Sequence, residues 1–165
     1  MPSLIAIFRG LGFLALTLPL MPVQQILLWI GAPAARALPH YYHRLLCIIL
    51  GIKVTVEGAL PSAPALIIAN HVSWADIPVL SAVLPLSFVA KLEVAGWPLF
   101  GTLARLQRTV FIDRQRRHTT GHSKNLLAER LLGSDMLVLF PEGTSHNGKT
   151  LLSFKSSYFV RWKTA

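Results

Sequence analysis

The first third of the chain is dominated by one long apolar stretch. Residues 10–31 contain no charged side chain, and a helix of this length can cross the ~30 Å hydrocarbon core of a bilayer. Two prolines and two glutamines interrupt the apolar pattern, so a helix that lies in the surface or re-enters one leaflet is the alternative to a spanning one. We expect a membrane-embedded helix here, followed by a second helix over residues 36–50.

From Lys53 onward, short apolar runs alternate with longer segments of helical character. The expected strands are residues 53–57, 65–69, 87–91, 108–113 and 135–140, and the expected helices are residues 77–84, 97–106 and 119–132. Alternating strands and helices predict an α/β domain built on one sheet. We therefore divide the chain into a membrane-anchoring helical segment, residues 1–50, and an α/β domain with a mixed sheet flanked by helices, residues 51–165.

Composition and charge point towards lipid. Hydrophobic residues make up 53% of the 165 residues and charged residues only 14%, whereas soluble domains are typically ~25% charged. The net charge of +9 attracts anionic lipid, nucleic acid or a phosphorylated substrate. The apolar excess favours lipid, and without a nucleic-acid recognition motif we expect no nucleic-acid partner. More Lys and Arg follow residues 10–31 than precede them, which predicts that the rest of the chain lies on the cytoplasmic side of the membrane.

The first motif with candidate chemistry is N-H-V-S-W-A-D, residues 70–76. His71 directly follows an apolar strand, and a tight loop into the next helix can bring Asp76 beside it. A carboxylate beside an imidazole fixes the tautomer and prepares the histidine to take a proton from a hydroxyl. No G-x-S-x-G elbow accompanies the pair, so His71 would activate an alcohol of the substrate. From spacing alone, a structural histidine beside a helix N-cap is the alternative.

Two further motifs follow expected strands. Arg114 ends F-I-D-R just past a strand, where α/β sheets place ligand sites, and its planar guanidinium suits phosphate, although an Arg alone is more often solvated surface. In F-P-E-G-T-S, residues 140–145, Gly143 permits close approach of a ligand and Thr144 offers a hydroxyl. Together these residues predict a phosphate pocket.

Residues 143–150 also satisfy G-x-x-x-x-G-K-[ST], the phosphate loop of nucleotide hydrolases. In that motif the glycine-rich turn closely follows its strand, but Pro141 and Glu142 intervene here. The residues after Thr150 are too few to supply a magnesium-binding aspartate on another strand. We therefore do not expect ATP hydrolysis.

In this order, N-H-x-S-x-x-D, F-I-D-R and F-P-E-G-T-S resemble the motifs of the glycerolipid acyltransferase family. Its best-known members are the bacterial 1-acylglycerol-3-phosphate acyltransferases. The motifs span residues 70–145, and weaker resemblance runs from about residue 51 to 157. The resemblance implies a membrane-bound enzyme without metal or prosthetic group. It would transfer an acyl chain from acyl-CoA or acyl carrier protein to the free hydroxyl of a lysophospholipid.

Carried over residue by residue, the resemblance implies a role for each motif position. His71 would be the general base, supported by Asp76, with Asn70 and Ser73 in the same loop. The acceptor, with its phosphate, would be bound or positioned by Arg114, Glu142, Gly143 and Thr144. Lysophosphatidic acid is the expected acceptor, and a lyso-aminolipid such as lyso-ornithine lipid is the alternative.

The C-terminal end departs from the family pattern. Ser156 and Ser157 follow F-K where the family usually has a glycine, and the family continues with further elements that complete the sheet. We therefore expect a C-terminally truncated chain with an incomplete sheet. An inactive, membrane-anchored fragment is the alternative to an active enzyme.

Overall fold

The computed structural model describes the backbone of residues 3–113, 120–145 and 148–154, and the side chains of the same residues except 120–124. The chain divides into two compact units. The first unit is Met1–Ala59 with Ile77–Leu86, and the second is Leu60–Asp76 with Ser87–Ala165. These units are defined by packing, and the predicted boundary after residue 50 stays a prediction.

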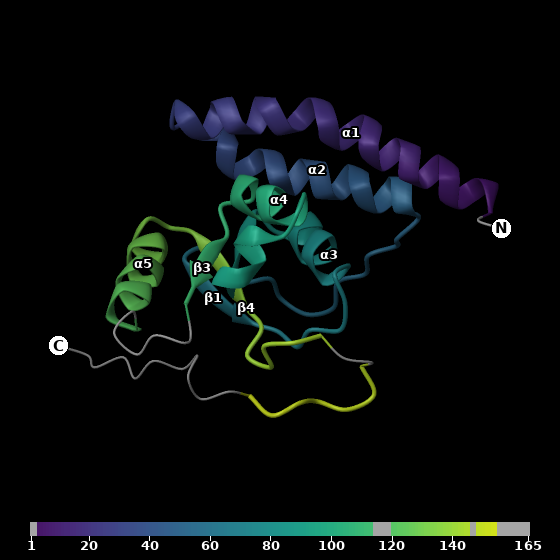
Figure 1. Ribbon diagram of the computed structural model, residues 1–165. Helices are drawn as coiled ribbons and strands as arrows, with labels where there is room; N and C mark the ends of the chain where they lie inside the picture. Colours follow the sequence, from purple (N-terminus) through teal and green to yellow (C-terminus); the bar gives the residue numbers. More distant parts are fainter. Residues whose placement is uncertain (1–2, 114–119, 146–147, 155–165) are drawn as a thin grey trace. The chain divides into compact units, whose positions relative to one another are not determined.

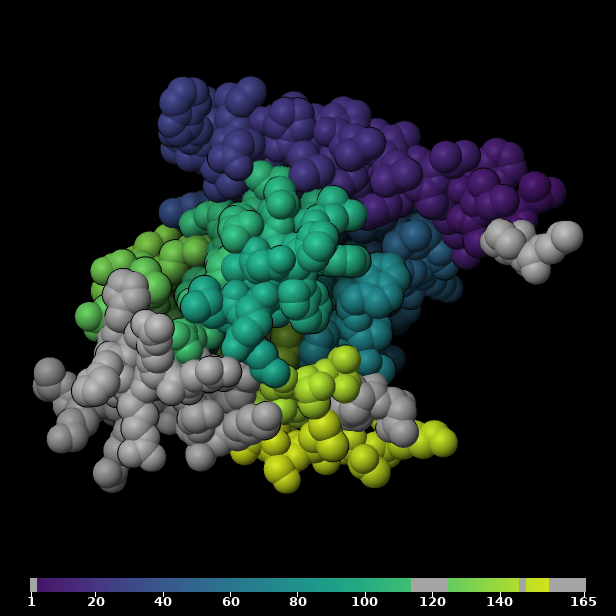
Figure 2. All heavy atoms as spheres, in the orientation of Figure 1, coloured from purple at the N-terminus to yellow at the C-terminus, as the bar shows by residue number. Residues whose placement is uncertain are grey.

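The first unit is built on two long helices that pack against each other, α1 (Leu4–Trp29) and α2 (Ala34–Leu50). They lie side by side in Figure 1. The Ser3 hydroxyl caps α1 by accepting from the Ala6 N–H at 3.3 Å. With a mean hydropathy of 2.0 and only 6% of its most apolar window buried, α1 is long and apolar enough to cross a membrane. Its side chains form a continuous surface, purple in Figure 2.

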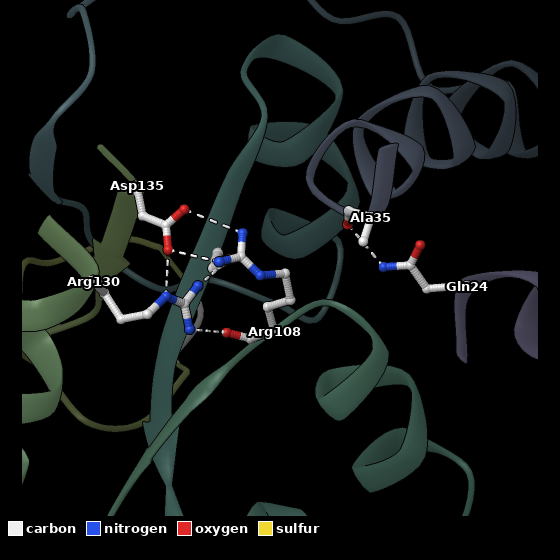
Figure 3. A network of polar contacts seen from close by, with 6 residues as sticks. Gln24, Ala35, Arg108, Arg130 and Asp135 are labelled. Carbon is white, nitrogen blue, oxygen red and sulfur yellow. Dashed lines mark hydrogen bonds and ion pairs between the residues drawn. The ribbon is translucent and has the colours of Figure 1, made fainter. Parts of the chain in front are cut away.

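A proline inside α2 creates a polar contact between the two helices. Pro39 has no N–H, so it cannot supply the helical hydrogen bond that the Ala35 carbonyl would otherwise accept. The buried Gln24 of α1 donates from Nε2 to this carbonyl at 2.9 Å (Figure 3). A second polar contact joins Thr17 and Tyr42, whose hydroxyls lie 2.8 Å apart. Side chains of both helices thus make polar contacts where α1 and α2 pack together.

The second unit is built on a parallel sheet with the strand order β1-β4-β2-β3. The strands are β1 (Ala65–Ile68), β2 (Leu86–Lys91), β3 (Val110–Ile112) and β4 (Met136–Leu139). Between β2 and β3 lie a 3₁₀ helix, η1 (Leu92–Gly96), and α4 (Phe100–Leu106), and α5 (Thr120–Leu132) connects β3 to β4. One buried apolar cluster contains strand residues Val89, Val110, Leu137 and Leu139, against which Ile112, Leu126, Leu127 and Leu131 pack.

Most predicted elements are confirmed, and α3 (Asp76–Val83) begins at the aspartate that the sequence singled out. The strand predicted over residues 53–57 is wrong, because these residues form neither helix nor strand. Their alternating pattern fits a strand, but a strand also needs a neighbour to hydrogen-bond with. The sheet is incomplete: β1 lies at its edge, with Leu66 and Ile68 exposed. The β1–β4 pair and the β2–β3 pair are both parallel, although a mixed sheet was expected.

An ion-pair cluster joins the residues that precede the strands of this sheet (Figure 3). Asp135, just before β4, accepts two hydrogen bonds from the Arg108 guanidinium at 2.8 and 3.1 Å and a third from Arg130 Nε. Arg130, near the end of α5, also donates to the Arg108 carbonyl at 2.8 Å and to the Ser87 hydroxyl at 3.0 Å. The cluster therefore ties α5 to the amino ends of β2, β3 and β4.

Candidate active site

The candidate site lies at the opposite, carboxyl end of the sheet. His71 comes shortly after β1 and Glu142 shortly after β4, and these two strands are parallel neighbours. The Ala69 N–H donates to the Leu139 carbonyl at 3.1 Å, which extends the pairing past the end of β1. Both loops therefore leave the sheet at the carboxyl ends of the strands, where parallel α/β sheets place their ligand sites.

The loop between β1 and α3 brings His71 and Asp76 together. His71 Nδ1 lies 2.8 Å from Asp76 Oδ2, and the same oxygen accepts the backbone N–H groups of Val72 at 2.7 Å and Ser73 at 3.0 Å. An oxygen that accepts two backbone N–H groups acts as an acceptor towards the ring as well, so Nδ1 carries the proton. The neutral imidazole then presents the lone pair of Nε2. Both side chains are partly open to solvent.

The His71 ring is also fixed from its face. It stacks on Phe140 with a centroid distance of 4.3 Å and an interplanar angle of 22°. Phe140 in turn stacks on Phe88 at 6.0 Å, and both phenylalanines are buried. The hydrogen bond to Asp76 and the stacking together leave the imidazole little freedom to rotate.

Glu142 lies directly behind this loop and is only 1% exposed. Its Oε2 accepts the backbone N–H of His71 at 2.9 Å, and its Oε1 accepts that of Leu152 at 3.1 Å. A tight turn aims the side chain: the Gly143 N–H donates to the Phe140 carbonyl at 3.1 Å, and Gly143 has the positive φ of 71° that glycine adopts without strain. These contacts of the carboxylate are with the backbone of the chain itself.

Asn70, Ser73 and Thr144 lie in the same two loops, which follow β1 and β4. Asn70 is exposed, and the Ser73 hydroxyl accepts the Ala75 N–H at 3.1 Å, which shapes the turn into α3. Thr144 is exposed, and its hydroxyl has only a long contact of 3.4 Å with the Ser145 carbonyl. The structure thus brings His71, Asp76 and Ser73 of one loop into contact, and Glu142 of the neighbouring loop contacts His71. Asn70 and Thr144 make no hydrogen bond to these residues among the contacts that the structure describes.

Arg114 lies outside the described residues, so its predicted contact with a phosphate stays a prediction. The binding roles of Asn70, Ser73, Gly143 and Thr144 also stay predictions. Among the residues that the structure describes, no three His, Cys, Asp or Glu side chains form a group able to hold a metal ion.

Two contributors to this site were not predicted from the sequence. Phe140 was counted as the end of a strand and the first residue of F-P-E-G-T-S, without a role of its own, yet its ring stacks on His71. Leu152 takes part through its backbone N–H, which no sequence pattern marks. For Phe140 a signal was present, because an aromatic residue directly before P-E-G at the end of a buried strand is well placed to contact a neighbouring loop.

Comparisons with known proteins bear directly on this arrangement. A family model described as "Acyltransferase" matches residues 51–161. The chain is 48% identical to the lyso-ornithine lipid O-acyltransferase of Rhizobium meliloti (strain 1021), over 91% of this chain and 52% of that protein. It is 44% identical to the enzyme of the same name from Brucella abortus (strain 2308), over 90% of this chain and 56% of that protein.

A second group of relatives carries a different name. The chain is 38% identical to the 1-acyl-sn-glycerol-3-phosphate acyltransferase of Neisseria gonorrhoeae, over 67% of this chain and 44% of that protein. The chain thus spans about half the length of the curated relatives that it matches. No solved structure matches it significantly. Because the family model covers well over half of the chain and includes all three motifs, this protein belongs to the acyltransferase family.

Proposed function

We propose that this protein transfers an acyl chain from a thioester donor, acyl-CoA or acyl carrier protein, to the free hydroxyl of a membrane lyso-lipid. The observation that supports this most strongly is the 2.8 Å contact of His71 Nδ1 with Asp76 Oδ2, in a loop where two backbone N–H groups hold the same carboxylate oxygen. In the neutral ring, this arrangement places the proton on Nδ1 and leaves the lone pair on Nε2, which is the tautomer a general base requires.

The proposed reaction needs one proton carrier. Nε2 of His71 takes the proton of the acceptor hydroxyl while the hydroxyl oxygen attacks the carbonyl carbon of the thioester. Asp76 stabilises the resulting imidazolium. The C–S bond then breaks, and the imidazolium returns the proton to the leaving thiolate, giving an ester and a free thiol. Atoms and charges balance without a metal or a prosthetic group.

The remaining residues would serve in positioning. Glu142 would hold the backbone of His71, because its carboxylate oxygens accept the N–H groups of His71 and Leu152. Arg114, Gly143 and Thr144 would contact the head group of the acceptor, with Asn70 and Ser73 shaping the loop beside it.

For the acceptor we propose lyso-ornithine lipid. The chain is 48% and 44% identical to two enzymes named for that acceptor, against 38% for the relative named for 1-acylglycerol 3-phosphate. Lysophosphatidic acid, which the motifs alone favoured, remains the second candidate because both groups of relatives match the same region of the chain. We also propose that the site faces the cytoplasm at the inner membrane, where α1 anchors the protein.

The test is an acylation assay on membranes that contain this chain. Each lyso-lipid is supplied separately, with radiolabelled acyl-CoA or acyl carrier protein as donor, and membranes with His71→Ala serve as the blank. The proposal predicts ester formation on lyso-ornithine lipid that exceeds that on lysophosphatidic acid. Faster acylation of lysophosphatidic acid would overturn the choice of acceptor while leaving the chemistry intact.

A further inference from the structure

The turn between η1 and α4 exposes large apolar side chains that the proposed chemistry does not use. Within residues 92–100, the exposed fractions are 47% for Leu92, 56% for Trp97, 42% for Leu99 and 56% for Phe100. We refer to residues 97–100 as the apolar turn. Figure 2 shows η1 and α4 uncovered on the face towards the viewer, in teal and green. Apolar side chains of this size are normally buried or in contact with a partner.

The backbone of the apolar turn is strained. Leu99 has φ 59° and ψ −56°, and the Phe100 N–H donates to the Pro98 carbonyl at 2.6 Å. These values describe the γ-turn with positive φ, which is rare because it crowds the side chain of any residue except glycine. Strained residues persist where the surrounding structure enforces them, and they are concentrated at functional surfaces.

Here the surrounding structure enforces the strain by a close approach of η1 and α4. A Cβ on Gly101 would lie 2.4 Å from the Ala95 carbonyl oxygen, so only glycine fits this position. The same carbonyl accepts a hydrogen bond from Arg105 Nη2 at 2.7 Å. The turn is therefore a rigid support for exposed apolar side chains, and its shape does not depend on burying them.

We propose that the apolar turn inserts into the interfacial region of a lipid bilayer, as a membrane contact of the second unit separate from α1. Tryptophan prefers the level of the lipid head groups, and leucine and phenylalanine prefer the acyl chains just below. Lys91 precedes η1 and Arg105 lies in the last turn of α4, against one acid, Glu93. This local excess of positive charge, on a chain of net charge +9, complements an anionic bilayer surface.

A lipid bilayer fits this surface better than a protein partner. A stable protein interface buries about 800 Å² on each partner and takes roughly 20–30 residues from each. The apolar turn offers a few side chains from one short segment, which is too little for such an interface. Individual aromatic and aliphatic side chains, in contrast, suffice for contact with a bilayer when another element already anchors the protein.

The test places a fluorophore on the apolar turn of the complete chain. Trp97→Cys, in a Cys47→Ala background, is labelled with a nitrobenzoxadiazole probe and reconstituted into vesicles of phosphatidylethanolamine and phosphatidylglycerol. Glu129→Cys, on the exposed face of α5 in the same unit, is the matched control. Phe100→Cys is a second reporter if Trp97→Cys does not fold. Quenching is measured with nitroxide-labelled lipids and with aqueous iodide.

We expect the probe at position 97 or 100 to show blue-shifted emission, strong quenching by nitroxide lipids and little quenching by iodide, with the reverse at position 129. Quenching by iodide at all three positions would overturn the proposal, because the turn would then lie in water. Shielding from both quenchers would overturn it too, since protein would then cover the turn. If nitroxide lipids quenched the probe at position 129 as strongly as the probe at position 97 or 100, the proposal would also be overturned, because the apolar turn would have no specific contact with the bilayer. None of these outcomes depends on acyl transfer.

Discussion

At the scale of single residues, the site depends on one carboxylate oxygen. Asp76 Oδ2 receives His71 Nδ1 and the N–H groups of Val72 and Ser73, so the residue that orients the ring also holds the loop around it. A helix N-cap and a catalytic partner were alternatives for Asp76 on sequence grounds. The structure places Asp76 in the first turn of α3, and the N–H groups that its Oδ2 accepts belong to the loop before the helix.

The variant Asp76→Asn tests the catalytic part of this arrangement. An amide supplies no negative charge to an imidazolium and favours the wrong tautomer of His71, so we expect kcat to fall by about 10³–10⁴-fold. The KM for the acceptor should stay close to that of the wild type. Steady-state kinetics on reconstituted membranes measure both. A kcat within a few fold of the wild type would mean that Asp76 serves only to hold the loop before α3.

Glu142→Gln separates two roles for the buried glutamate. If Glu142 holds the backbone of His71, the amide loses one of two acceptor positions and shifts the loop. Since small misplacements of a catalytic group can cost about 10²-fold, we expect kcat to fall by roughly that factor. The KM for the acceptor should change little. A raised KM with unchanged kcat would instead support the head-group role that the sequence predicted.

At the scale of elements, the proline inside α2 is compensated by a side chain of α1. Pro39 removes a helical donor within α2, and Gln24 of α1 supplies another. Such compensation fixes the axial position of one helix against the other, because the donor and the acceptor meet at only one register. Apolar packing alone is far less selective about register.

Gln24→Leu should therefore destabilise the packing of α1 on α2. Leaving the Ala35 carbonyl without its Gln24 donor should lower the free energy of unfolding by about 1–3 kcal/mol. The neighbouring Gln25 is exposed, so Gln25→Leu is a matched control and should change stability little. Thermal unfolding in detergent, followed by circular dichroism, compares the two variants. Equal stability would show that the contact is dispensable.

The cluster around Asp135 stabilises the amino ends of the strands. Burial raises the pKa of Asp135, but hydrogen bonds and charges from Arg130 and Arg108 outweigh burial and lower the pKa below its usual value. The stability that this lowering provides is present above the ordinary pKa of aspartate and is lost as the pH falls through the lowered value.

Asp135→Asn removes the charge that the two arginines share. We expect the free energy of unfolding at neutral pH to fall by about 2–4 kcal/mol, because both guanidinium groups lose their counter-charge in a mostly buried site. Denaturant unfolding of the variant and of Glu129→Gln, an exposed control on α5, measures the difference. The difference in the free energy of unfolding between the wild type and Asp135→Asn should become smaller in acid. A difference that does not depend on pH would contradict the ion-pair account.

At the scale of the whole molecule, local patterns predicted the order of elements and the position of the site. Apolar runs marked β1 to β4, and polar residues shortly after β1 and β4 marked the loops that carry His71 and Glu142. A local pattern failed at residues 53–57, where alternation without a neighbouring strand produced no strand. Strand formation depends on partners elsewhere in the chain, which a local pattern does not contain.

Contacts between distant residues were the part that the sequence could not predict. Glu142 and His71 are 71 positions apart, and Arg108 and Asp135 are 27 apart. The contact of Glu142 with His71 follows from the strand order β1-β4-β2-β3, in which β1 lies beside β4 although β2 and β3 separate them in the sequence. The Trp97–Phe100 turn was likewise missed, because its strain arises from the approach of η1 to α4.

The most direct measurement of the central claim is acceptor-dependent release of free thiol from an acyl thioester, by membranes containing the wild-type chain or His71→Ala. The account predicts one thiol for each ester formed by the wild type, and a rate lower by about 10²–10⁴-fold in His71→Ala. Equal rates in the two would contradict a general base at His71. A wild-type chain that acylates neither lyso-lipid would contradict the proposed function.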